Sequence, residues 1–159
     1  MMMESFEQKK RRIMGKQFLP RYIKSLNKIL LNTILPNAFL SIVETDAFYS
    51  QINYEKKPSI KKTILFSERK NIEMILKEHS IDFNEKYILW MEYADDCGAF
   101  KIESLNCFDF GFPYNVSKNG VITLTQVDYK YRISWDFYEN NNIEYLDIEL
   151  FYEIRKWEG

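Results

Sequence analysis

The sequence predicts an α+β fold in which N-terminal helices pack on one face of an antiparallel β-meander sheet of about five strands. Two observations predict it. From Phe18 onward, apolar residues of the first half recur at steps of three and four, the spacing of an amphipathic helix. From Tyr87 the period changes to two, the spacing of a β-strand.

Length and composition indicate one domain over residues 1–159. The chain is 46% apolar and 16% aromatic, and its nine Gly and Pro residues exclude a low-complexity chain. A domain of this size buries roughly 70% of its unfolded surface, so a core rich in Phe, Tyr and Trp is expected.

The first half is expected to hold the helices. Residues 1–15 read as a basic arm that is either flexible or a helix extension. An amphipathic helix follows from Phe18 to Ile34, and Pro36 is expected to end it. Residues 37–58 allow a helix capped by Asn37 or a short strand, and the helix is favoured.

A short edge strand and one further helix complete the first half. The strand is expected over Ile60 to Phe66, where exposed lysines discourage pairing with other chains. Ser67 is the expected N-cap of a helix that ends near His79. On its outer face Glu73 and Lys77 have the spacing of an ion pair.

The second half is expected to form the sheet. Residues 87–93 are apolar on both faces, which predicts a central strand, and a turn at 95–98 joins it to a strand over 99–104. Residues 121–127, 129–137 and 143–152 then form a three-stranded meander.

Cysteines and hydropathy predict a cytoplasmic protein. Cys97 and Cys107 match no zinc or redox spacing, so free thiols in a reducing compartment are expected. The start of the chain lacks the apolar stretch of a secretory signal. The most apolar segment, 26–40, is too polar to span a bilayer, so no membrane partner is expected.

Charge is divided along the chain. Residues 1–81 carry 15 Lys or Arg against 8 Asp or Glu, a balance of +7, whereas residues 82–159 carry 7 against 15, a balance of −8. Such a division is typical of a charged binding face, unless the two halves neutralise each other in space.

The sequence contains few residues that match known catalytic motifs. There is no phosphate loop, nucleophile elbow or zinc-binding pair of histidines, and the single histidine, His79, continues an apolar helical stripe. Asp95 and Asp96 leave a metal-dependent hydrolase as the alternative, in the manner of restriction-endonuclease-like nucleases. The chain departs from that layout, because Ala99 stands where a second carboxylate is needed and Glu103 lies on the wrong side of Lys101. No catalytic residue, metal or cofactor is therefore expected.

Nucleic-acid binding through the basic arm is a second alternative. Lys9 to Arg12 form a basic run. However, 18 of the 26 aromatic residues, which could stack on bases, lie in the acidic half, where phosphate would be repelled. Nucleic acid is therefore an unfavoured partner.

Protein binding is the favoured function. An antiparallel sheet often keeps one face in water, and aromatic anchors with carboxylates on such a face suit a basic partner. The candidate partner-binding residues are Glu92, Tyr93, Asp95, Asp96, Glu103, Tyr114, Tyr138, Glu144 and Asp147.

Three segments carry a resemblance to a known class of proteins. They are the basic amphipathic N-terminal helix, the stretch YILWMEYADDCGAFKIES (87–104) and the terminal meander ISWDFYENNNIEYLDIELFYE (133–153). In type, the chain resembles the small bacterial immunity proteins that neutralise polymorphic or contact-delivered toxins. The resemblance implies a non-enzymatic cytosolic inhibitor whose acidic, aromatic surface binds a basic toxin domain, such as a nuclease.

Overall fold

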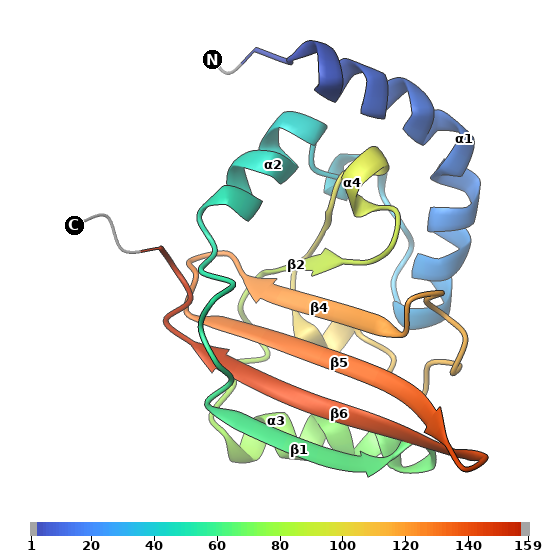
Figure 1. Cartoon of the computed structure of the whole chain (residues 1–159), viewed down its shortest axis with the longest axis vertical. Coiled ribbons are helices and arrows are strands. Elements are labelled where there is room, and N and C mark those ends of the chain that lie inside the picture. The colour runs from blue at the N-terminus through green and yellow to red at the C-terminus, as the bar shows by residue number, and fades with distance from the viewer. Residues whose placement is uncertain (1–2, 157–159) are drawn as a thin grey trace.

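A six-stranded antiparallel sheet forms the centre of the structure, a computed structural model that describes residues 3–156. The α+β prediction is confirmed, with one strand more than the expected five. The strand order is β1-β6-β5-β4-β2-β3 (Figure 1). The strands are β1 (Ile60–Leu65), β2 (Tyr87–Trp90), β3 (Phe100–Ile102), β4 (Val121–Gln126), β5 (Tyr131–Asn140) and β6 (Ile143–Tyr152).

The first helix, α1 (Phe6–Ile29), includes most of the basic arm, so these residues form the helix extension rather than a flexible arm. Ser5 and Gln8 form a capping box at its start. The predicted extent to Ile34 is wrong, because the helix ends before Leu30. That residue is extended and forms a β-bridge with Phe108, a partner distant in sequence.

The second helix, α2 (Ile42–Ser50), confirms the helix favoured for residues 37–58. Its cap is not Asn37, which lies in a 3₁₀ turn, η1 (Pro36–Ala38). Ser41 accepts from the backbone N–H of Glu44, and the Glu44 carboxylate accepts in return from the N–H of Ser41. This capping box stops the helix from starting earlier.

The third helix differs from expectation at its start. A 3₁₀ segment, η2 (Phe66–Asn71), precedes α3 (Ile72–Glu78), so Ser67 is not an N-cap. Instead, the Glu68 carboxylate accepts a hydrogen bond from the backbone N–H of Leu65 at 3.3 Å. The expected ion pair of Glu73 and Lys77 is present at 3.2 Å.

Strand β2 is central, between β4 and β3, as predicted, but it ends at Trp90. The predicted hairpin is confirmed by the antiparallel pairing of β2 and β3, but its connection contains a short helix, α4 (Ala94–Cys97), where a turn at 95–98 was expected. Gly98 ends this helix at a φ of +90°, and a Cβ there would lie 1.9 Å from the carbonyl oxygen of Leu40. Only glycine fits this close approach. A further 3₁₀ turn, η3 (Leu105–Cys107), follows β3.

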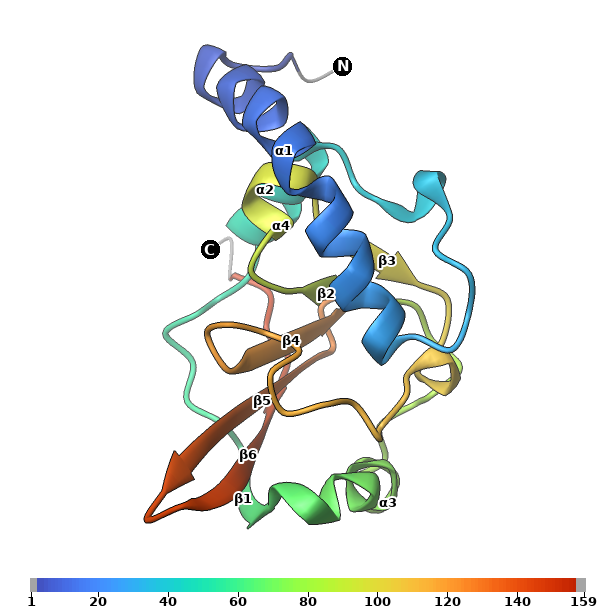
Figure 2. The same cartoon turned by 90° about the vertical axis from the view of Figure 1, so that its right-hand side faces the viewer.

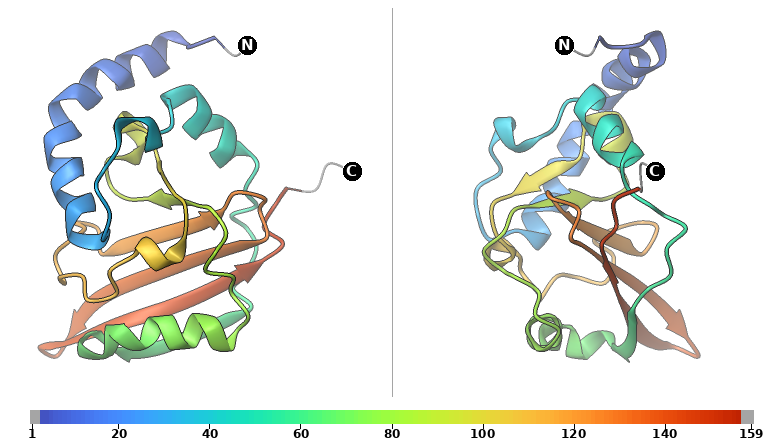
Figure 3. Two further views of the ribbon diagram at one scale, coloured as in Figure 1. Left: turned by 180° about the vertical axis from the view of Figure 1, so that it is seen from behind. Right: turned by 90° about the vertical axis from the view of Figure 1, so that its left-hand side faces the viewer.

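The largest core cluster lies on one face of the sheet, and two smaller clusters, which include Phe151 and Ile88, lie on the other. Strands β4, β5 and β6 form the predicted meander, whose alternate residues point into this core. Trp135 is fully buried there, with Phe108 and Phe112 centred 4.9 and 6.1 Å from its ring. Helices α1 and α3 cover this face, and Figure 3 shows both from behind. Among the described residues, no helix has the length and hydropathy to cross a membrane.

Candidate functional site

The opposite face of the sheet is largely uncovered. Figures 1 and 2 show α3 and the lower part of α1 on one side of strands β4, β5, β6 and β1, and only α2 approaches the other side, at one end. The strand registers place eleven partly or fully exposed residues on this uncovered side. We call it the open face: Lys61, Thr63, Leu65, Val121, Thr123, Ser134, Asp136, Tyr138, Tyr145, Asp147 and Glu149.

Two tyrosines form its aromatic part. Tyr138 and Tyr145 lie directly opposite each other on β5 and β6, with ring centroids 5.7 Å apart in a stacked arrangement. The Tyr138 hydroxyl donates to Asp147 Oδ1 at 3.2 Å, and the Thr63 hydroxyl donates to the same oxygen at 2.6 Å. Donors from both neighbouring strands therefore fix the Asp147 carboxylate, and the stacked rings give rigid contact area beside it.

Carboxylates gather next to this pair. Asp136 lies directly opposite Asp147, an arrangement that destabilises a sheet. Burial is the main cause that raises the pKa of Asp136, followed by the charges of Glu149 and Asp147, while Lys61 opposes the shift. Within residues 3–156, none of the three carboxylates forms an ion pair. This part of the face therefore keeps uncompensated negative charge.

An arginine bounds the open face toward α2. The Arg132 guanidinium lies 3.9 Å from the ring centroid of Phe151 and 4.9 Å from that of Tyr54. Burial is the main cause that lowers its pKa. Beyond it, the Trp90 indole donates to Thr125 at 3.0 Å beneath α2. Packed aromatic rings thus close one end of the open face and leave the β5–β6 hairpin end free.

Only two of the predicted site residues, Tyr138 and Asp147, lie on the open face. Glu144 lies near the hairpin tip, opposite Glu139, and points to the other side of the sheet. Tyr114 is half-buried on that side against Phe66 and Phe137. Burial, followed by the charges of Glu144 and Glu139, raises the pKa of Tyr114.

Four more predicted residues lie in the segment 92–96, which includes the first three residues of α4, beside α1. Tyr93 stacks on Phe18 at 5.6 Å and belongs to the core edge. Asp95 remains exposed, but its backbone carbonyl accepts hydrogen bonds from Arg11 at 2.6 and 2.9 Å. Arg11 also binds Asp46 at 2.7 Å. Glu92 and Asp96 are partly buried. The hydrogen bonds from Arg11 to the Asp95 carbonyl bring the basic and acidic halves of the chain into contact at this place.

The last predicted residue, Glu103, follows β3 and pairs with Lys86 at 3.5 Å. The nine predicted residues therefore lie in separate parts of the molecule. Sequence reasoning missed Asp136, Tyr145 and Glu149. They could have been found as the polar positions that alternate with apolar ones in the last two strands.

The geometry gives little support to a cysteine nucleophile or to a metal-dependent hydrolase. Burial is the main cause that raises the pKa of the Cys97 thiol to about 11, which keeps it protonated at neutral pH. Cys97 belongs to α4 at one end of the molecule, whereas His79 caps α3 at the other (Figure 1). Within residues 3–156, no group of three or more His, Cys, Asp or Glu side chains could hold a metal ion.

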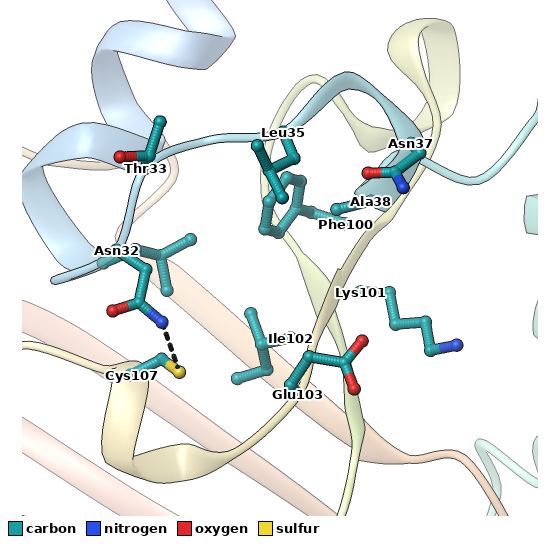
Figure 4. Close-up of a pocket in the computed structure, with 11 residues that line it drawn as sticks. Asn32, Thr33, Leu35, Asn37, Ala38, Phe100, Lys101, Ile102, Glu103 and Cys107 are labelled. Atoms are coloured by element: carbon teal, nitrogen blue, oxygen red, sulfur yellow. Dashed lines mark hydrogen bonds between the residues drawn. The ribbon is translucent and has the colours of Figure 1, made fainter.

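A cavity of about 330 Å³ lies away from the open face (Figure 4). It is bounded by the connection after α1, by the outer edge of β3 and by η3. Within it, the Asn32 side-chain amide donates to Cys107 Sγ at 2.9 Å. Its lining mixes apolar and polar side chains: Leu30, Asn32, Thr33, Leu35, Asn37, Ala38, Phe100, Lys101, Ile102, Glu103 and Cys107. Of these, only Glu103 was a predicted site residue.

No protein-family model, curated protein or solved structure matches this chain.

Proposed function

We propose that this chain is a non-enzymatic cytoplasmic inhibitor that binds a basic toxin domain through the open face. One observation carries the proposal. A sheet face without covering helices presents a stacked tyrosine pair beside three carboxylates that form no ion pair within residues 3–156. The resemblance to immunity proteins, stated above from the sequence, supports the class of partner.

The arrangement of charge supports a basic partner. Asp136 opposite Asp147 costs the free protein stability, so the pair opposes local sheet energetics. A Lys or Arg of a partner placed between the two carboxylates would relieve this repulsion. Residues that lower the stability of the fold locally, as these two carboxylates do, are expected at functional sites.

The dimensions also suit an interface. Strands β5 and β6 have ten residues each. At about 3.4 Å per residue and about 4.8 Å between strands, four strands give a surface of roughly 34 by 14 Å, or about 500 Å². A standard interface buries about 800 Å² on each partner, so the exposed hairpin tip at residues 140–143 would contribute the remainder.

The test compares two double charge reversals in affinity capture from lysate of the source organism. Asp136→Lys with Glu149→Lys changes the open face. Glu55→Lys with Glu78→Lys makes the same change in net charge at two exposed residues elsewhere. We expect wild type and the control to capture a basic protein at low salt, and the open-face variant to lose it, because like charges then meet.

The captured protein is then expressed in a heterologous host with each variant. Wild type and control should rescue growth if it is a toxin, and the open-face variant should not. Equal capture by the open-face variant would exclude this surface. A captured protein that has no effect on growth would contradict the inhibitor function.

A further inference from the structure

The outer side of α1 carries a basic surface that the open face does not use. Lys9, Lys10, Lys16, Arg21, Lys24 and Lys28 are all exposed. Within residues 3–156, none of them forms an ion pair. The nearby Arg12 is different, because it is bound to Glu4 at 2.8 Å. Six uncompensated cations therefore follow one helix.

Large apolar side chains lie among these cations. The exposed fraction is 86% for Phe6, 51% for Ile13 and 42% for Met14, and it is 88% for Met3 just before the helix. Phe6 and Ile13 are seven positions apart, or about two turns, so they share one side of the helix with Lys10 between them. The outward side thus combines basic and apolar groups.

The cap of α1 and the contacts on its inner side hold the basic and apolar side of the helix toward solvent. The capping box of Ser5 and Gln8 stabilises the helix start. Gln8 donates to Asp46 at 2.9 Å, and Arg11 donates to both oxygens of the same carboxylate. Gly15 packs so closely on α4 that a Cβ would lie 2.0 Å from a backbone carbonyl oxygen. In Figure 2 the first turns of α1 project beyond the rest of the molecule.

We propose that the outer side of α1 binds the surface of an anionic phospholipid membrane, with the helix lying in the plane of the headgroups. Lys and Arg are attracted to anionic lipid at about 1 kcal/mol each. Phe6 and Ile13 would enter the boundary of the acyl chains, while Lys9 and Lys16 extend to the headgroups.

The apolar residues decide between possible partners. A nucleic-acid duplex would satisfy the cations through its phosphates, but its phosphate backbone offers no apolar layer for Phe6 and Ile13. The helix projects as a convex ridge, which suits a broad surface. The expectation of no membrane partner rested on the missing membrane-spanning segment, and surface binding requires none. The proposal is independent of the open face, which lies on different elements.

The test is co-sedimentation with vesicles of phosphatidylcholine alone or with about 30% phosphatidylglycerol. Wild type should sediment only with the anionic vesicles. Lys9→Glu with Lys10→Glu and Lys16→Glu should lower the partition coefficient by on the order of 100-fold or more, because about 1 kcal/mol is lost with each lysine and each glutamate is repelled by the anionic lipid. The matched control makes the same changes at three exposed lysines outside α1: Lys57, Lys62 and Lys118. Its partition coefficient should be closer to that of wild type than the partition coefficient of the α1 variant is.

A second variant tests the apolar contribution. Phe6→Ser with Ile13→Ser should weaken vesicle binding at least 10-fold without changing net charge, and circular dichroism should show unchanged helix content. Failure of wild type to sediment with anionic vesicles would overturn the proposal, and so would an equal loss in the lysine control. Binding to duplex DNA that exceeds vesicle binding and ignores the serine variant would instead identify a nucleic-acid surface.

Discussion

Replacement of Asp136 by Asn is expected to stabilise the protein at neutral pH. Asp136 faces Asp147 across β5 and β6 and has Glu149 nearby. Burial, followed by these two charges, raises its pKa, so its ionised form is unfavourable in the folded state. Asn has nearly the same shape and no charge, which removes the repulsion.

The size of the effect follows from the cross-strand arrangement. Interactions between directly opposed side chains in a sheet are worth about 0.2–1 kcal/mol. Asp136 is partly exposed, and solvent screening places the expected gain in the lower half of that range, at about 0.5 kcal/mol. For a chain of 159 residues this corresponds to a rise in Tm of about 1–2 °C.

The pH dependence of stability is a second test of the direction of the effect of Asp136→Asn. The pKa of Asp136 is higher in the folded protein than the unfolded value of about 3.9, so the folded state binds more protons between the two pKa values. Wild type therefore loses stability as pH rises through that window. The advantage of Asn should be absent at about pH 3 and complete at pH 7.

Thermal unfolding followed by circular dichroism at both pH values measures this difference. Glu78→Gln is the matched control, because it removes one exposed carboxylate outside the sheet. A lower Tm for Asp136→Asn at pH 7, or the same gain at pH 3 and pH 7, would refute the repulsion argument.

Three further changes test the packing around both surfaces. Gly15→Ala should destabilise by about 1–3 kcal/mol through overpacking against α4, although Ala favours helix by about 1 kcal/mol; a higher Tm would contradict the close contact. Thr63→Val should cost about 1 kcal/mol in urea unfolding by removing a donor to Asp147, and no loss would show that the hydrogen bond is not needed. Hydrogen bonding to Arg11 is the main cause that lowers the pKa of Asp46, so its stabilisation is present above the unfolded pKa and lost as pH falls. Arg11→Gln should therefore cost up to about 1 kcal/mol at pH 7 and less below about pH 4, and a loss independent of pH would exclude the ion pair as its cause.

Local patterns predicted those elements whose limits are set by local chemistry. The alternation of apolar and polar residues from Tyr131 to Phe137 predicted β5, because period two places one set of residues in the core. The end of α1 could not be predicted in this way. Leu30 leaves the helix to pair with Phe108, and no local pattern shows a partner so distant in sequence.

The site was less predictable than the fold. Tyr138 and Asp147 were expected on a partner-binding surface, but which face of the sheet the helices cover depends on contacts between distant segments. Asp136 and Glu149 become part of the same surface only through the register of β5 and β6. Asp95 and Asp96 had the strongest local signal, yet they lie where α1 packs on α4.

The division of charge along the sequence has a partial counterpart in space. The ion pairs within residues 3–156 each join residues of the same half: Arg11 with Asp46 in the basic half, and Lys86 with Glu103 and Lys130 with Glu85 in the acidic half. What remains uncompensated within residues 3–156 includes the carboxylates of the open face and the cations on the outer side of α1. These surfaces belong to different elements, so a basic protein and an anionic membrane could be bound together. Each attraction weakens beyond about 10 Å at 0.1 M salt, so each surface should act independently of the other.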